Sequence, residues 1–123
     1  MHSIFVKIDG KYKGILFAEI LYVEAFKNYV RIHTVRKVYV THNTLKQVEE
    51  HLPTQLFCRI HKSYVIALDK LTDFDHDSVT LDKIQLPLTS QYTDTLKSKL
   101  NVVCNKKKSK LSVVTNGSVF PKN

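Results

Sequence analysis

The sequence is a close succession of short β-rich runs with turn residues between them, which leaves little room for helices. The run IFVKI meets Asp9-Gly10, a dipeptide that favours a tight hairpin because both positions tolerate positive φ. YKGILF and ILYVEA follow, and YVRIHTV then alternates apolar with polar residues. A short Arg36-Lys37 turn leads into VYVTH. Strands at this spacing predict a mainly β fold with antiparallel sheets.

The hydrophobic period changes to a helical one in THNTLKQVEEHL. Thr44 and Gln47 have the spacing of a capping box, which predicts a helix beginning here. Pro53 is expected to stop it. Such a short helix needs packing against a sheet for its stability. The apolar positions that would form this contact are Leu45, Val48 and Leu52.

The second half of the chain predicts a further hairpin and a terminal helix. LTDF is followed by a turn of Asp75, His76, Asp77 and Ser78, and then by VTLD and IQLPL. Thr89 is placed to cap the terminal helix. The stripe of this helix would consist of Tyr92, Leu96 and Leu100.

The length of 123 residues and the hydrophobic fraction of 43% fit one domain with a real core. We expect this domain to cover residues 1–103 and a flexible basic tail to cover residues 104–123. No apolar run approaches the roughly 20 residues of a membrane-spanning helix, and the N-terminus lacks a secretory signal pattern. The two cysteines, Cys58 and Cys104, form no disulfide framework, which favours a reduced, cytoplasmic protein.

The net charge of +8 is unevenly distributed along the chain. Five lysines and no acid fall in residues 101–123, and six aspartates fall between Asp69 and Asp94. The stretch from Ala25 to Val48 has no carboxylate, so a polyanion would prefer it to the acidic region, although an ordinary solvated surface explains the same composition. The basic residues of this stretch are Lys27, Arg31, Arg36, Lys37 and Lys46.

Few residues have the spacing that catalysis or metal binding requires. Cys58 and His61 are two residues apart, but no second ligand pair stands nearby, so zinc is not expected. Asp75 and Asp77 lack the glycine and glutamate of a calcium loop. The apolar setting of Cys58 favours an inert thiol, and no glycine-rich phosphate loop is present. We therefore expect no enzyme activity, no metal and no cofactor.

The segment FCRIHKSYVIAL places four polar residues in the middle of an apolar run. Together with ILYVEAFKNYVRIHT, TLKQVEEHLP and LPLTSQY it resembles the LytTR DNA-binding domain, an output module of bacterial two-component response regulators. The run F-x-R-x-H-[RK]-S-[YF] is the most specific match, and the four matches extend from Ile4 to about Leu100.

The resemblance implies elongated, layered antiparallel sheets with one or two short helices. It also implies sequence-specific binding of double-stranded DNA by loops that enter major grooves, as in a transcriptional regulator. The loops would be the one before the YVRIHT strand, the His-[Arg/Lys]-Ser turn, and the turn that opens the C-terminal helix. In this chain their residues are Lys27, Asn28 and Tyr29, then His61, Lys62 and Ser63, then Thr89, Ser90 and Gln91.

Several of these side chains have alternative roles that the sequence leaves open. Lys62 is expected to contact DNA, whereas His61 is expected to be a structural hydrogen-bonding residue. Arg59 either pairs with a carboxylate such as Glu24 or faces DNA, where an arginine can bind guanine or phosphate. Asn28 suits adenine recognition but also suits a two-residue turn, and Tyr29 more readily covers the sheet than stacks on a sugar.

The third loop departs from the family pattern. The family commonly has an arginine or lysine where this chain has Ser90 followed by Gln91. Neither residue brings charge, so affinity is expected to depend more on Arg31, Arg36 and Lys37 and on the basic tail. The chief alternative function is a β module that binds RNA, another polyanion or a protein.

The family context also predicts partners. LytTR domains usually follow a phosphorylatable receiver domain and bind repeated half-sites in pairs. This chain has no room for a receiver, so it is an excised output domain or a stand-alone regulator, and strand sequence soon after Met1 favours excision. We expect a monomer in solution that pairs on DNA.

Overall fold

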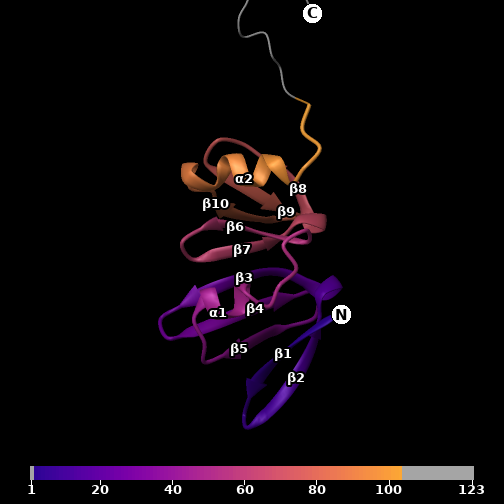
Figure 1. The fold of residues 1–123 in the computed structure, drawn as a ribbon, viewed down its shortest axis with the longest axis vertical. Helices are drawn as coiled ribbons and strands as arrows, with labels where there is room; N and C mark the ends of the chain where they lie inside the picture. The colour runs from indigo at the N-terminus through magenta and orange to yellow at the C-terminus, as the bar shows by residue number, and fades with distance from the viewer. Residues whose placement is uncertain (1, 104–123) are drawn as a thin grey trace, which may run out of the picture.

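The computed structural model of the chain describes residues 2–103, and it has the expected mainly β, layered and elongated architecture (Figure 1). Three antiparallel sheets are formed, with orders β1-β2, β5-β4-β3-β7-β6 and β10-β9-β8. The predicted tail at 104–123 lies outside the described residues. The strands are β1 Ser3–Ile8, β2 Lys11–Leu16, β3 Ile20–Phe26, β4 Tyr29–Thr34, β5 Val38–Thr41, β6 Phe57–His61, β7 Tyr64–Ala67, β8 Leu71–Phe74, β9 Ser78–Leu81 and β10 Ile84–Pro87, and the α-helices are α1 Leu45–Glu49 and α2 Thr93–Ser98.

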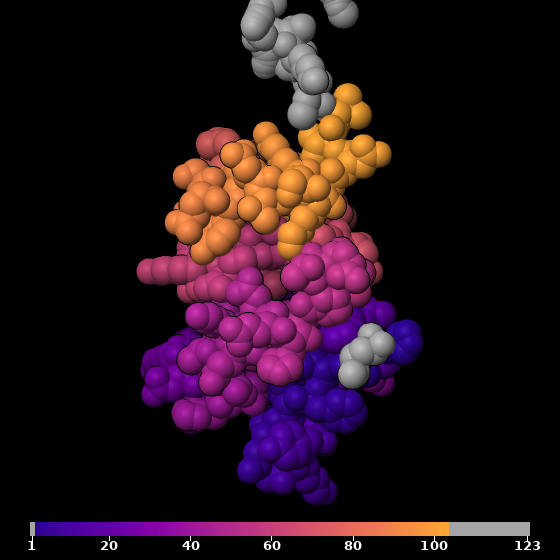
Figure 2. Space-filling model, viewed as in Figure 1, coloured from indigo at the N-terminus to yellow at the C-terminus, as the bar shows by residue number. Residues whose placement is uncertain are grey.

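Both faces of the five-stranded sheet are buried, each in its own hydrophobic core. Strand alternation sends neighbouring residues to opposite faces. In β7, Val65 joins the core formed with the β1–β2 hairpin and α1, while Ile66 joins the core formed with β8–β10 and α2. In β3, Val23 and Tyr22 divide in the same way. Figure 2 shows α1 in magenta between the N-terminal hairpin and the β6–β7 region.

The first hairpin forms as the sequence predicts. Asp9 and Gly10 have φ of 52° and 78°, and Ile8 pairs with Lys11 across them. Positive φ at both central residues is the backbone of a two-residue turn that matches the twist of the strands.

The capping box of α1 is confirmed, but the end of the helix is not where Pro53 would put it. The Thr44 hydroxyl accepts from Gln47 N at 3.1 Å, and Thr44 N donates to the Gln47 side chain at 2.9 Å. The α-helix ends at Glu49. His51 N and Leu52 N then donate three residues back, so the chain tightens into 3₁₀-type turns before the proline.

The terminal helix also begins differently from the prediction. Thr89 precedes a 3₁₀ turn, Ser90–Tyr92, and its side chain makes no capping bond. The α-helix starts only at Thr93. The apolar stripe is confirmed, because Leu96 is fully buried and Tyr92 and Leu100 pack against the same core. Within residues 2–103 no helix has the length and apolar character needed to cross a membrane.

Candidate nucleic-acid interface

Two hairpin turns lie at the same end of the five-stranded sheet. The β3–β4 turn contains Lys27 and Asn28, and the β6–β7 turn contains Lys62 and Ser63. Strands β3 and β7 are antiparallel neighbours, which brings the end of one beside the start of the other. Ala25 N donates to Ser63 O at 2.9 Å, so the backbone links the two turns directly. Figure 1 shows both turns on the left of the molecule.

The β6–β7 turn is held by the guanidinium of Arg59. Its Nε donates to His61 O at 2.7 Å, and one terminal nitrogen donates to Lys62 O at 2.6 Å. The other terminal nitrogen donates to Glu49 Oε1 at 2.6 Å. Arg59 therefore pairs with Glu49 on α1, and the example of Glu24 offered by the sequence is wrong.

His61 has the structural role that the sequence favours. Its Nδ1 accepts from Ser63 N at 3.0 Å across the turn, which requires an imidazole whose proton is on Nε2. Its ring also lies 5.5 Å from the Tyr64 ring. These contacts fix the two residues on either side of Lys62, whose side chain is exposed.

The β3–β4 turn presents an exposed cation and an exposed amide. Lys27 has φ of 58°, and its ammonium lies 5.4 Å from the Phe26 ring centre. Asn28 is exposed. Tyr29 makes an edge contact with His42 at 5.2 Å and remains 45% exposed, so it partly covers its neighbour while keeping a free ring surface.

A groove of about 740 Å³ connects these turns with the loop between β5 and α1. Four basic side chains line it and none of its lining residues among those described is acidic, so it is a cationic groove. Within residues 2–103, the ammonium groups of Lys27, Lys46 and Lys62 form no ion pair. The lining residues of the cationic groove are Ala25, Lys27, Asn28, Tyr29, His42, Asn43, Thr44, Leu45, Lys46, Gln47, Arg59 and Lys62.

Lys46, His42 and Asn43 are the groove residues that the predicted site omitted. Lys46 appears in the sequence only as part of a basic stretch, and no local motif marks it. Its position depends on the β5–α1 loop, which tertiary hydrogen bonds hold in place. The Thr41 hydroxyl lies 2.9 Å from Lys7 O and 2.8 Å from Asn43 Oδ1, and it joins the loop to β1.

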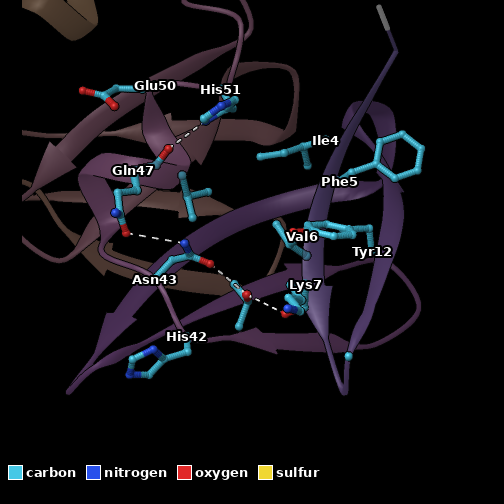
Figure 3. Close-up of a pocket in the computed structure, with 13 residues that line it drawn as sticks. Ile4, Phe5, Val6, Lys7, Tyr12, His42, Asn43, Gln47, Glu50 and His51 are labelled. Atoms are coloured by element: carbon cyan, nitrogen blue, oxygen red, sulfur yellow. Dashed lines mark hydrogen bonds between the residues drawn. The ribbon is translucent and has the colours of Figure 1, made fainter.

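A second cavity, of about 750 Å³, lies on the other side of this loop, between the first hairpin and α1 (Figure 3). Figure 3 shows the hydrogen bonds that run from Lys7 through Asn43 to Gln47 and His51. Its lining includes Glu50 and apolar side chains. The cavity is therefore chemically mixed, and its hydrogen bonds fix one wall of the cationic groove.

Arg31 lies beside the turns but is already engaged. Its guanidinium carbon lies 3.7 Å from the Phe26 ring centre, and one nitrogen lies 3.6 Å from Glu24 Oε1. The same carboxylate accepts from His33 Nε2 at 2.8 Å. The Glu24 carboxylate and nearby burial of the phenol act together at Tyr64, where burial first and the carboxylate second raise the pKa.

The third predicted segment is connected to the second one. Thr89 N donates to Ile60 O at 2.9 Å, which attaches the segment to β6 next to the Lys62 turn. Ser90 and Gln91 are exposed. The structure therefore brings all three predicted segments to one end of the sheet.

Arg36 and Lys37 lie at the opposite end of β4 from the Lys27 turn. Arg36 donates to Glu19 Oε1 at 3.0 Å. The Lys37 ammonium lies 4.8 Å from the Tyr39 ring centre. These two residues do not join the cationic groove, although the sequence grouped them with it.

The remaining chemical groups behave as ordinary structural features. Burial raises the pKa of the Cys58 thiol, which favours the neutral, unreactive form. Asp75 accepts from Asp77 N and Ser78 N, and these hydrogen bonds, first from the Asp77 backbone, lower its pKa. The exposed cluster of Asp75, His76 and Asp77 is thus a turn whose carboxylate is satisfied by its own backbone.

Known proteins resemble this chain over most of its described length. The family model described as the LytTr DNA-binding domain matches residues 10–101. Two proteins called sensory transduction protein LytT, from Bacillus anthracis and Bacillus cereus, are 27% and 26% identical over 108 residues. Each match covers 83% of this chain and 44% of the relative, so the chain spans less than half the length of these curated relatives.

A solved structure gives the same result for the fold. It is the LytTr DNA-binding domain of a putative methyl-accepting/DNA response regulator from Bacillus cereus, with a TM-score of 0.69 and 17% identity. The alignment covers 83% of this chain and 99% of that one. The family match over residues 10–101 and the shared fold lead to one conclusion: this chain belongs to the family of LytTR DNA-binding domains.

Proposed function

We propose that this domain binds double-stranded DNA sequence-specifically and acts as the output domain of a bacterial transcriptional regulator. The observation that carries the proposal is the cationic groove, which is framed by the two family turns and has no acidic lining residue. A duplex is the polyanion that these linked hairpins suit, because the turns project side chains as a pair from one rigid sheet. Binding through loops would place these side chains in the major groove.

The turn residues divide into base-reading and phosphate-binding groups. Lys62 and Asn28 are the proposed base readers, since a lysine suits guanine acceptors and an amide suits adenine. Lys27 and Lys46 are the proposed phosphate contacts, which set register without reading sequence. Supporting contacts come from Tyr29 and Arg31 and from the backbone-linked segment with Ser63, Ser90 and Gln91.

The wider arrangement follows from the family. We propose that residues 1–103 form the DNA-binding unit, that the whole protein places it after a receiver domain, and that two copies occupy repeated half-sites. The isolated domain is then a monomer before it meets DNA. A stable dimer at micromolar concentration in a size measurement would contradict this part of the proposal.

The test begins with selection of bound duplexes from a random library by the purified domain. The selected duplex, a scrambled duplex, single-stranded RNA and heparin then compete in gel-shift assays. We expect the selected duplex to compete at least tenfold better than the others. Equal competition by RNA and heparin would remove the basis for sequence-specific DNA binding and would leave a general polyanion-binding module.

A further inference from the structure

We propose that Arg59 is a positioning residue that holds Lys62 in its DNA-reading geometry, and that Glu49 orients Arg59 for this task. The inference rests on the proposed function. It gives Arg59 a role different from the DNA contact that its place in the motif suggests.

The donors of Arg59 are committed to the protein. A guanidinium has five N–H groups in a fixed planar fork. Bonds to His61 O, Lys62 O and Glu49 Oε1, all 2.6–2.7 Å long, use all three of its nitrogens. Charge-assisted hydrogen bonds of this length are the strong ones. Turning the group toward a phosphate would break all three bonds at once.

The acceptors show what the guanidinium organises. Two of them are the carbonyls on either side of the His61–Lys62 peptide unit, so the fork closes on the backbone that carries the Lys62 side chain. The third acceptor lies on α1, the helix that also carries Lys46. The guanidinium thus joins the turn to the opposite wall of the cationic groove.

The register of β6 explains why the side chain reaches α1. Phe57 and Arg59 share one face of the strand, and Cys58 and Ile60 belong to the core on the other face. A register irregularity follows between Arg59 and His61 in the pairing with β7. A turn that is irregular in its pairing gains more from an added clamp than a regular one does.

Removing Glu49 separates this role from simple electrostatics. A carboxylate close to a DNA site repels phosphate, so its loss alone should strengthen binding. A positioning role predicts the opposite, because Arg59 would lose the acceptor that orients it. We therefore expect Glu49→Ala to weaken binding of the selected duplex by about tenfold, with little change on a scrambled duplex.

The matched control is Glu50→Ala. It removes the same charge from the next residue, whose side chain lines the mixed cavity rather than the cationic groove. We expect its binding to be unchanged or slightly tighter. Arg59→Gln completes the set, and its salt slope should stay within about half a unit of the wild-type slope, since one lost phosphate contact would lower the slope by about 0.9.

The outcomes are distinct. Circular dichroism and thermal unfolding first establish that Glu49→Ala and Arg59→Gln are folded at the assay temperature. Tighter or equal binding by Glu49→Ala, or a slope loss near 0.9 for Arg59→Gln, would overturn the positioning role. A wild-type domain that shows no preference for the selected duplex would instead overturn the proposed function.

Discussion

The two ends of the five-stranded sheet both carry basic side chains, but only one end leaves them available. At the turn end, Lys27, Lys46 and Lys62 line a groove that contains no acidic residue among those described. At the opposite end, Arg36 donates to Glu19, and Lys70 Nζ donates to Ala18 O at 2.8 Å. The density of basic residues along the sequence is therefore a poor guide to a binding surface, because the neighbours of each cation decide whether it can meet a polyanion.

The largest effect expected is on the salt dependence of the wild-type domain. If the turn end contacts about six phosphates, affinity for duplex DNA should fall by roughly a thousandfold between 50 and 200 mM salt. Fluorescence anisotropy over this range measures the slope. A flat response would contradict a phosphate-dominated interface at either end of the sheet.

The next largest effect is expected from the two turns together. The double variant Lys27→Ala/Lys62→Ala should lose roughly a hundredfold in affinity for the selected duplex, because each specific contact contributes about 1–3 kcal/mol. Arg36→Ala at the opposite end should stay within about twofold. The comparison breaks if Arg36→Ala costs as much as the turn variants.

The positive φ of Lys27 calls for a second variant in that experiment. Lys27→Gly removes the charge at a position where glycine adopts φ of 58° without strain. Combined with Lys62→Ala, it should give the same loss as the alanine version. A full recovery of binding with glycine would show that backbone strain, and not the missing ammonium, caused the defect.

A smaller effect is expected from Lys46. Lys46→Ala should weaken selected and scrambled duplexes alike, by about fivefold, and should lower the salt slope by about 0.9. Lys83→Ala is the matched control, since Lys83 lies in the exposed β9–β10 turn at the far end of the last hairpin. Identical slopes for the two variants would remove Lys46 from the interface.

The smallest effect concerns stability at the opposite end. Glu19→Gln should lower the free energy of unfolding by less than about 1 kcal/mol, because the Arg36 side chain is 69% exposed and solvent screens the pair. Urea denaturation measures this change. A loss of several kcal/mol would mean that the pair holds the sheet together and would weaken the comparison between the ends.

Local patterns were sufficient for most of the fold. The Asp9-Gly10 hairpin and the Thr44 capping box depend on residues close in sequence, and both are confirmed. The start of the terminal helix was wrong because Thr89 donates its backbone N–H to β6 and begins a 3₁₀ turn. That contact joins residues 29 positions apart, which no local pattern reports.

The site was predictable in its turns but not in its supports. The partner of Arg59 was wrong because Glu24 lies on the other face of the sheet, with His33, whereas Arg59 faces α1. Strand alternation contains part of that information. The distance to Glu49 does not appear in the sequence, because it depends on how α1 lies across the sheet.

The central sheet forms a wall that both cores share. Adjacent residues of β3 and β7 belong to opposite cores, so neither half of the domain can keep its apolar residues covered after the other has opened. Heating should therefore melt residues 2–103 in a single cooperative step. An engineer who transplants this module has to move it whole, since either half alone would expose a hydrophobic surface and aggregate.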